Sequence, residues 1–385
     1  MPILKGVYSD ILIVGYHIWN SHKRGGIHSI AKYFAQKGKN VHFFRYPVPI
    51  YRCLKTGVSL KKLADYIIPK VFMVANGKIV SSVAITGIGY TRFDNYFPSH
   101  LKTAIDEFVR FSIPYIKFEQ YKVVVIESWE SLISLNWTNN GQKIIYRASD
   151  PIFTYSDNKF LLKLEDKIIK RADVILTVNY IHQQIFLKRG DGLKEKIFMW
   201  RNIFDPYEYS SVKTSPYKPG EKIAIYYGAY PIEWRYIERA AKINKDWNIV
   251  IIGPDLLDSY ARKVLKLNNV RYLGGMNECD ALKYIKFADI GLLPYKYKPA
   301  VKYCDLSHKV LHYMYCGLPI IAPYYVENLK KYGVYLARSL EEFGSLIHEL
   351  ANTKINYDAF INFASFSEKE SFKALDSIFA LCGIL

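Results

Sequence analysis

Short apolar runs alternate with longer segments of helical spacing along the whole chain. The segment 27–38 is an example of the second kind, because it is amphipathic and ends on Gly38 as a helix C-cap would. In the first half of the chain, apolar runs of strand length lie at 10–15, 40–44, 122–128, 143–148 and 173–178. Strands that alternate with helices are typical of a parallel sheet covered by helices. We therefore expect an α/β fold.

A second series of apolar runs begins after a segment that has no period. Residues 203–222 contain three prolines and a cluster of Ser and Thr, which favours an interdomain linker. Apolar runs then return at 223–228, 248–253, 270–275, 289–295 and 318–323. A chain of 385 residues also exceeds the size at which one core usually stops growing. We predict two doubly wound, Rossmann-like domains, 1–202 and 223–366, that face a central cleft at the carboxyl ends of their strands.

The tail of the chain, residues 367–385, has the apolar stripe of a helix. Two placements fit this pattern: the helix crosses back onto the N-terminal domain, or it remains a simple terminal helix on the second domain. The pattern leaves both open.

The charge of the chain is strongly positive and unevenly distributed. The net charge is +18, and residues 1–80 alone carry 13 Lys and Arg against two acids. Aromatic residues such as Trp19, Tyr46 and Tyr51 interleave with these cations, which include Lys23, Arg24, Arg45, Arg52, Lys55, Lys61 and Lys62. This combination predicts peripheral contact with an anionic membrane surface. A solvated basic face is the alternative, and a non-catalytic polyanion or nucleic-acid binder would rest on charge alone, because the chain has no recognised nucleic-acid motif.

Other classes of protein are disfavoured by what the sequence lacks. It has no apolar run near the roughly 20 residues of a spanning helix and no signal-peptide pattern at its start, so we expect a cytoplasmic protein. The five cysteines are scattered without a C-x-x-C pair, which argues against a disulfide framework or a zinc site. The chain also contains no D-x-D and no cluster with metal-ligand spacing, so we expect no metal cofactor.

The segment 298–323 has the pattern of an anion site. Asp305 or Ser307 can cap a helix that carries Lys309 in its first turn and ends at Gly317. The start of a helix presents unpaired N–H groups and a positive dipole end, and Lys309 adds a full charge. Such a site suits a nucleotide diphosphate. The alternative is a surface lysine beside an ordinary cap.

Two carboxylates follow neighbouring strands of the first domain. Glu127 ends the run 122–128, and Asp150 follows the run 143–148. The end of a strand in a doubly wound domain lies at the ligand cleft, so Asp150 is a candidate base and Glu127 a reserve base or acceptor-binding residue. Arg147 would orient Asp150 or bind an anionic group, although a nearby guanidinium would also depress the pKa of Asp150. A purely structural Arg–Asp pair is the alternative.

Several blocks of the sequence resemble one glycosyltransferase family. The stretch from ADIGLLPY (288–295) to GLPIIAP (317–323) is similar to the nucleotide-sugar half of GT-B glycosyltransferases. It is more closely similar to glycosyltransferase family 70, the xanthan-biosynthesis β-glucuronosyltransferase type. The residues that carry this resemblance are Pro294, Tyr295, Asp305, Ser307, Lys309 and Gly317. The blocks VIES (125–128), YRASD (146–150) and HKRGGIHSIAKYFAQKG (22–38) resemble the same family in the same order.

The resemblance implies a fold, a reaction and a set of substrates. It implies the GT-B fold, Asp150 as the catalytic base, a UDP-sugar donor with glucuronate as the candidate sugar, and a polyprenyl-diphosphate-linked oligosaccharide as acceptor. The glutamate pair of the retaining GT-B enzymes would fall on Cys304 and His312, so an inverting transfer is expected. A nucleotide-sugar epimerase of the same double fold is the alternative enzyme.

Further residues are assigned from their place in the pattern. Glu127, Arg147 and Arg24 are expected on the acceptor side. On the donor side, the resemblance has a glutamine near His312, which favours a hydrogen bond from this residue to ribose or phosphate, while a buried helix histidine is the alternative. The other expected donor contacts follow strands of the second domain or begin the capped helix: Gly228, Gly275, Met276, Tyr295, Ser307 and Lys309. For Gly228 and Gly275, ordinary turn glycines are the alternative.

Overall fold

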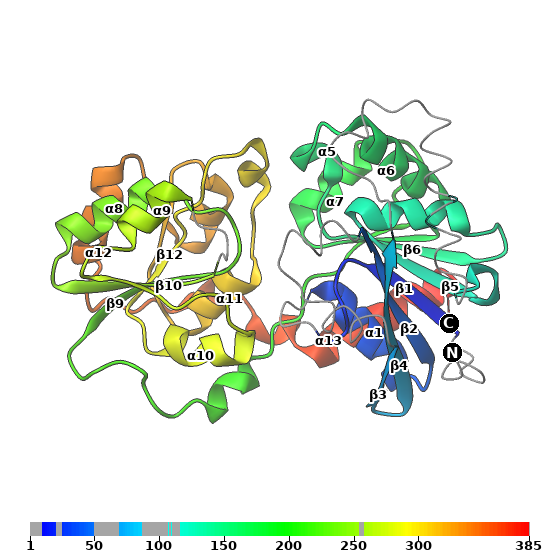
Figure 1. The fold of residues 1–385 in the computed structure, drawn as a ribbon, viewed down its shortest axis with the longest axis horizontal. Helices are drawn as coiled ribbons and strands as arrows, with labels where there is room; N and C mark the ends of the chain where they lie inside the picture. Colours follow the sequence, from blue (N-terminus) through cyan, green and yellow to red (C-terminus); the bar gives the residue numbers. More distant parts are fainter. Residues whose placement is uncertain are drawn as a thin grey trace. The chain divides into compact units, whose positions relative to one another are not determined.

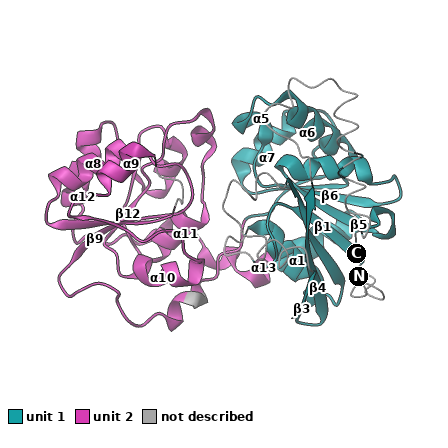
Figure 2. Ribbon diagram, viewed as in Figure 1, with its two compact units in different colours: residues 1–201, 372–385 teal, residues 202–371 magenta. Residues whose placement is uncertain are grey.

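Two sheets, one in each half of the chain, organise the computed structural model (Figure 1). The structure describes residues 10–20, 25–49, 69–86, 107, 109, 116–253 and 258–384. The chain divides into two units, drawn in different colours in Figure 2. Unit 1 consists of Met1–Arg201 with Phe372–Leu385, and unit 2 of Asn202–Ser371.

Unit 1 is built on an eight-stranded sheet in the order β3-β4-β2-β1-β5-β6-β7-β8. All neighbouring strands are parallel except β3 and β4, which form an antiparallel pair at one edge. The strands are β1 (Ile11–Gly15), β2 (Asn40–Pro49), β3 (Lys70–Val74), β4 (Gly77–Thr86), β5 (Val123–Glu127), β6 (Lys143–Ala148), β7 (Val174–Thr177) and β8 (Ile197–Met199).

The central strands explain the apolar runs of the sequence. Every residue of β1 and of β5 is buried, because helices cover both faces of a parallel sheet. The described helical segments of this unit are α1 (Gly26–Gln36), η2 (Phe118–Gln120), η3 (Trp129–Trp137), α5 (Ile152–Tyr155), α6 (Lys159–Arg171), α7 (Tyr180–Leu187) and the last part of α13 (Glu368–Leu381).

The C-terminal part of α13 packs against α1 within unit 1. Phe379 stacks on Phe34 with ring centroids 5.5 Å apart, and the Tyr33 hydroxyl donates to Asp376 at 2.8 Å. Lys37, which follows α1, forms an ion pair with the same Asp376 at 2.7 Å. The end of the chain therefore helps to cover one helix of the N-terminal sheet.

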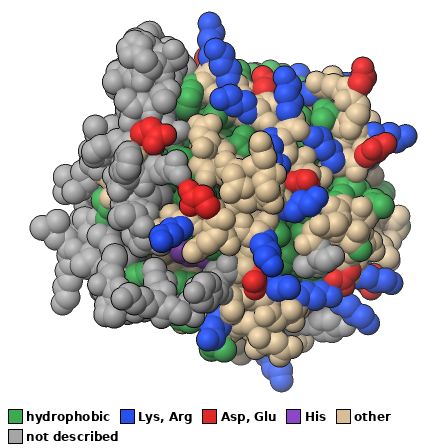
Figure 3. All heavy atoms as spheres, turned by 90° about the vertical axis from the view of Figure 1, so that its right-hand side faces the viewer, with side chains coloured by type: hydrophobic (Ala, Val, Ile, Leu, Met, Phe, Trp, Pro, Cys, Tyr) green, Lys and Arg blue, Asp and Glu red, His purple; other side chains and the backbone are tan. Residues whose placement is uncertain are grey.

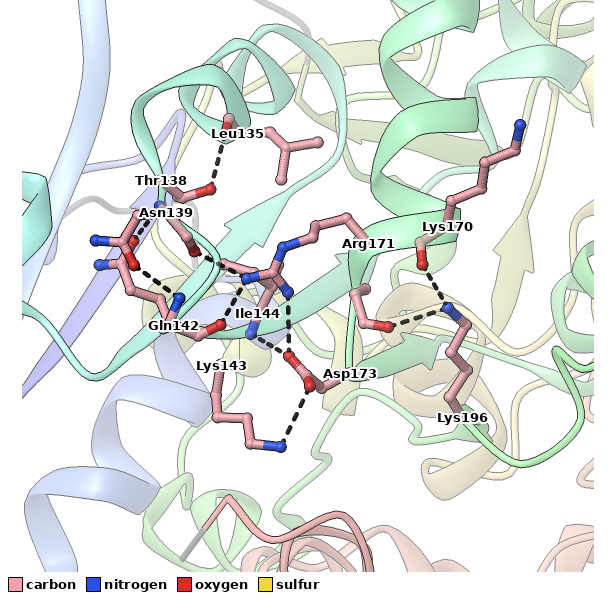
Figure 4. A network of polar contacts seen from close by, with 12 residues as sticks. Leu135, Thr138, Asn139, Gln142, Lys143, Ile144, Lys170, Arg171, Asp173 and Lys196 are labelled. Carbon is pink, nitrogen blue, oxygen red and sulfur yellow. Dashed lines mark hydrogen bonds and ion pairs between the residues drawn. The ribbon is translucent and has the colours of Figure 1, made fainter.

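A network of polar contacts lies at the N-terminal ends of strands β6 and β7 (Figure 4). The Arg171 guanidinium donates to the carbonyls of Asn139 and Gln142 at 2.9 and 2.7 Å, and Asp173 accepts from the Ile144 N–H at 2.8 Å. The Lys196 ammonium donates to the carbonyls of Lys170 and Ala172 at the end of α6. A cation at the carboxyl end of a helix satisfies carbonyls that have no partner inside the helix.

Unit 2 is built on a six-stranded, all-parallel sheet in the order β11-β10-β9-β12-β13-β14. Its strands are β9 (Lys222–Tyr227), β10 (Trp247–Ile252), β11 (Val270–Tyr272), β12 (Ile290–Leu292), β13 (Ile320–Pro323) and β14 (Tyr335–Ala337). Its helical segments are η4 (Pro206–Ser211), α8 (Trp234–Ile243), α9 (Ser259–Val264), α10 (Glu278–Lys286), η5 (Pro299–Tyr303), α11 (His308–Tyr315), η6 (Glu327–Tyr332), α12 (Leu340–Glu349), η7 (Tyr357–Ala359) and η8 (Phe363–Phe366).

The predicted α/β class is confirmed, and four strands, β3, β4, β8 and β14, lie outside the runs that the pattern predicted. The strands β8 and β14 have three residues each, and β3 is an edge strand with exposed residues. Short or exposed segments of this kind are hard to assign from periodicity, and β4, although ten residues long, is interrupted by Ser81 and Ser82. In the described part of the chain, no helix combines the length and apolar character that crossing a membrane requires.

Candidate functional site

The carboxyl ends of three neighbouring strands of unit 1, β1, β5 and β6, bring polar residues together. Because these strands are parallel and adjacent, Tyr16, Glu127 and Asp150 come to the same edge of the sheet. Sequence reasoning predicted the two carboxylates and missed Tyr16, which follows β1 directly. Burial raises the pKa of Tyr16, and the charges of Glu127, Glu130 and Asp150 raise it further, so its phenol stays neutral.

Asp150 is partly exposed and held from two sides. The Trp129 indole N–H donates to Asp150 Oδ2 at 3.1 Å, and the Ser128 hydroxyl donates to the Asp150 carbonyl at 3.0 Å. Trp129 has φ of 72°, a left-handed conformation that is rare for a bulky residue and found mainly at constrained sites. Burial raises the pKa of Asp150, while the Trp129 hydrogen bond and the charge of Arg147 lower it. The carboxylate therefore has a fixed orientation and a stronger basicity than an ordinary aspartate.

Glu127 is buried beside Asp150. The Ser149 hydroxyl donates to Glu127 Oε1 at 3.2 Å, whereas Oε2 has no partner of ordinary hydrogen-bond geometry among the described residues. Gly15 makes room for that oxygen, since a Cβ at Gly15 would lie 2.7 Å from it. Burial raises the pKa of Glu127 to about 7, against the lowering effects of Ser149, the Tyr16 backbone and Arg147. Near neutral pH this group exists in both protonation states.

Arg147 points to the backbone of neighbouring strands. Its guanidinium is buried, donates to the Trp200 carbonyl at 2.7 Å and to the Leu176 carbonyl at 3.4 Å, and lies 4.7 Å from the Trp200 ring. Burial lowers the pKa of Arg147 to about 9, although Glu127 and Asp150 raise it. These contacts agree with a structural role that reaches the carboxylates through charge. Arg24, the other cation expected on this side, lies outside the described residues.

In unit 2, Lys309 of α11 lies beside Gly228, the residue that follows strand β9. Its ammonium lies 4.7 Å from the Tyr226 ring and 4.9 Å from the Tyr295 ring, and it donates to the Tyr226 hydroxyl at 3.3 Å. None of the ion pairs found in the described part of the chain involves Lys309. Burial lowers its pKa to about 7, with a small opposing effect of Cys304. A desolvated cation with no carboxylate partner is prepared to bind an anion.

Gly228 permits this placement of Lys309. It follows β9 with φ of 134°, and a Cβ at this position would lie 2.5 Å from the Lys309 amine. Any larger residue would therefore displace the ammonium. Gly275 and Met276 lie farther along the same sheet, between β11 and α10, where Gly275 is exposed and Met276 packs against the core.

The start of α11 has buried polar atoms that lack a partner of ordinary hydrogen-bond geometry among the described residues. Ser307 is the N-cap residue of α11, yet its hydroxyl makes no capping bond, and this buried oxygen has no partner of ordinary geometry among the described residues. The same holds for His308 Nε2. Asp305, the other predicted cap, instead faces Lys331 at 3.7 Å. The unsatisfied atoms and the helix N-terminus together form an anion-binding arrangement next to Lys309.

The contacts of His312 lie within unit 2 and differ from those expected of a residue that binds the donor. Its ring is buried, with Nδ1 2.7 Å from the Tyr209 hydroxyl and Nε2 2.6 Å from Glu278 Oε1. Both ring nitrogens are thus engaged inside unit 2, and a hydrogen bond to a nucleotide would require one of these contacts to open. This arrangement corresponds to the alternative interpretation, a buried helix histidine.

Glu278, which contacts two histidines of α11, is a residue beside this site that sequence reasoning missed. It begins α10 and is partly exposed, with hydrogen bonds from His308 at 3.3 Å and from His312 at 2.6 Å. Although burial opposes it, these histidines hold the pKa of Glu278 well below its ordinary value. The sequence signal that could have identified Glu278 is an acidic residue at the first position of a helix that follows a strand. No cluster of His, Cys, Asp and Glu suited to a metal ion occurs in the ranges that the structure describes.

Family models match most of the length of both units. Residues 13–178 match the N-terminal domain of the glucuronosyltransferase GumK, and residues 232–352 match the group 1 glycosyl transferases. The N-terminal match includes the Glu127 and Asp150 edge, and the second match includes Lys309. The predicted resemblance is therefore confirmed at the level of these domains.

Two curated relatives match at low identity. One is a putative teichuronic acid biosynthesis glycosyltransferase, TuaH, of Bacillus subtilis (strain 168), 27% identical over 199 residues, or 46% of this chain and 50% of that protein. The other is the UDP-glucuronate:glycolipid 2-beta-glucuronosyltransferase of Xanthomonas campestris pv. campestris, 26% identical over 192 residues, or 48% of this chain and 44% of that protein. The matches span about half the length of these relatives.

Solved structures share the fold over nearly the whole chain. HepE of Anabaena, in complex with UDP and glucose, has a TM-score of 0.61 at 14% identity and covers 97% of this chain and 99% of its own. A UDP-N-acetylglucosamine 2-epimerase of Rickettsia bellii has a TM-score of 0.55 at 12% identity, covering 96% and 95%. These likenesses confirm the predicted GT-B fold. Because transferases and epimerases share it, the fold alone does not choose between the two reactions.

Proposed function

Because the chain belongs to the glycosyltransferases of the GT-B fold that have a GumK-type N-terminal domain, we propose that it transfers a sugar from a UDP-sugar to a hydroxyl group of a lipid-linked oligosaccharide, with inversion at the sugar carbon and without a metal ion. The observation that carries this proposal is the pair of strand-end sites. One offers a fixed carboxylate, Asp150, and the other offers a desolvated cation, Lys309.

Asp150 serves as the base. It takes the proton of the acceptor hydroxyl while that oxygen forms a bond to the sugar carbon and the bond from this carbon to the diphosphate oxygen breaks. A base of raised pKa is effective in such a step, because proton transfer is most favourable when the pKa lies near the working pH. Glu127, next to Asp150, is partly protonated near neutral pH, so its protonation changes the net charge at this edge of the sheet.

The diphosphate of the donor binds at Lys309 and the start of α11. The departing UDP gains negative charge as the sugar leaves, and the ammonium together with the helix N-terminus stabilises that charge. The Ser307 hydroxyl, which has no partner of ordinary hydrogen-bond geometry among the described residues and lies near the Tyr295 hydroxyl, donates to the same anion. These groups supply the positive charge that a metal ion would otherwise provide, which supports the proposed metal independence.

Glucuronate as the sugar and a glycolipid as the acceptor are the finer parts of the proposal. The name of the Xanthomonas relative contains both, and the description of the matching N-terminal family model contains the glucuronosyl part. A polyprenyl-diphosphate acceptor would place the protein at the inner face of the cell membrane, held peripherally by its basic N-terminal region. Most cations of that region lie outside the described residues, and on the face drawn in Figure 3 the Lys and Arg side chains are spread over the surface with acids between them.

The decisive experiment is a donor screen with the purified full-length chain. We expect binding of a UDP-sugar by calorimetry, transfer to a glycolipid acceptor, and full activity in the presence of a chelator. Asp150→Asn should bind the donor with unchanged affinity and lose roughly a hundredfold or more in kcat, the usual contribution of a general base. Absence of UDP-sugar binding would refute the proposal, and a product formed without acceptor would identify an epimerase instead.

A further inference from the structure

A cavity of about 930 Å³ opens on unit 2 away from Lys309. Its walls come from η6, from the edge strand β14 and from the residues that flank them. This volume lies within the range of roughly 300–1,000 Å³ that is typical of small-ligand sites. Because β14 is the last strand of its sheet, one row of its backbone N–H and C=O groups lies outside the ladder.

Two cations, Lys330 and Arg338, line the cavity, and the Glu342 carboxylate lies near one of them, where it accepts from the Arg338 backbone N–H at 2.7 Å. Lys330 and Arg338 are both exposed, and neither takes part in an ion pair in the described part of the chain. The neighbouring Lys331, in contrast, pairs with Asp305 at 3.7 Å. One acid, Glu327, also lines the cavity, so the lining has an excess of positive charge. The charge balance favours an anionic ligand of low charge density over a polyphosphate.

Two tyrosines also line the cavity. Tyr324 is 53% exposed and Tyr335 is partly exposed, so both present aromatic surface and a hydroxyl to a ligand. The Tyr324 ring packs on Tyr325 at 5.3 Å, and the Tyr325 hydroxyl donates to the backbone carbonyl of Tyr295. A row of tyrosines therefore links this cavity to the ring that contacts Lys309.

We propose that this cavity is a binding site for an acidic saccharide, a glycan segment that carries carboxylate groups. Sugar rings pack on Tyr324 and Tyr335, carboxylates pair with Lys330 and Arg338, and hydroxyl groups meet Glu327 and the open edge of β14. The role of the site rests on the proposed function, since it would hold the growing acidic glycan on the unit that binds the donor. Binding itself does not depend on transfer.

The test compares two sugars and two double variants of the full-length chain. A hyaluronan hexasaccharide supplies glucuronate, and chitohexaose is a neutral control of equal length. We expect calorimetry to detect the acidic sugar, with binding that weakens as salt increases. In Lys330→Ala/Arg338→Ala the affinity should fall about tenfold, because two partly exposed charge pairs are lost. The matched control Lys245→Ala/Lys266→Ala removes the same charge at exposed positions before β10 and β11 and should leave the affinity unchanged.

Three outcomes would overturn the inference. One is equal binding of the neutral and acidic hexasaccharides, or no binding of either. The second is an equal loss of affinity in the control double variant, which would indicate general charge attraction. The third is inorganic polyphosphate binding as tightly as the acidic sugar with no effect of Tyr324→Ala, which would indicate a simple polyanion surface.

Failure of the proposed function and failure of the saccharide site can be distinguished by experiment. Lys309→Ala should lose UDP-sugar binding and keep the hexasaccharide. If no sugar transfer is found but the Lys330→Ala/Arg338→Ala variant alone loses the hexasaccharide, the enzyme assignment fails and the saccharide site stands. If transfer proceeds and the hexasaccharide does not bind, the site is refuted and the enzyme assignment stands.

Discussion

The affinity for a UDP-sugar should depend steeply on pH through one group, Lys309. Its pKa lies at about 7 because its ammonium is desolvated between two tyrosine rings and against Gly228. Binding of the diphosphate requires the charged form, so the free protein must take up a proton above this pH. The nearby phenols do not complicate this picture, since burial raises the pKa of Tyr226 and of Tyr295.

The size of the effect follows from the fraction of protonated lysine. With a pKa of about 7, nearly all of the lysine is charged at pH 6 and about one part in a hundred at pH 9, so the dissociation constant should increase about 90-fold between these values. This corresponds to about 2.7 kcal/mol of binding free energy. A lysine of ordinary pKa would change the affinity by only a few per cent over the same range.

Calorimetry with an intact UDP-sugar on the Asp150→Asn variant is the appropriate assay. That variant prevents turnover, and the diphosphate of an intact UDP-sugar does not titrate between pH 6 and 9. Lys309→Arg is the matched control, because a guanidinium stays charged throughout and should make the profile flat. A flat profile in the parent protein, or the same slope in the arginine variant, would refute the assignment of Lys309 as the titrating diphosphate ligand.

Three further predictions concern other parts of the structure. The pKa of Glu127 is higher in the folded than in the unfolded protein, so the parent loses stability as pH rises from about 4.5 to 7. In urea unfolding, Glu127→Gln should therefore be more stable than the parent by up to a few kcal/mol at pH 8 and equally stable near pH 4. The control Glu195→Gln, at an exposed position, should leave the stability unchanged. Gly228→Ala should lower the melting temperature and weaken UDP-sugar binding at least tenfold, because its Cβ would lie only 2.5 Å from the Lys309 ammonium and its φ of 134° is strained for alanine. Unchanged UDP-sugar binding in calorimetry would contradict this geometry. Arg171→Ala should destabilise the chain by about 1–3 kcal/mol through two lost hydrogen bonds to carbonyls, while kcat of the folded variant stays the same because the network lies at the opposite edge of the sheet.

The sequence alone determined the class of fold and the positions of two chemical groups. The centres of the runs 122–128 and 143–148, residues 123–126 and 144–146, are apolar because their strands are buried on both faces, and this signal is local. The rule that parallel strands end at a common edge then selected Asp150 and Glu127. The same local reasoning, with helix capping, selected Lys309.

Only the tertiary structure decided which groups surround those residues. Trp129 donates to Asp150 from the end of another strand, and the charge of Asp150 acts on Tyr16 at the same edge. The contacts of His312 with Tyr209 and Glu278 join residues far apart in the chain. Periodicity reports the environment of one element, whereas hydrogen-bond partners, desolvation and the resulting pKa shifts depend on elements that the fold brings together. The desolvation of Lys309 is such a property, and no pattern in its own helix encodes it.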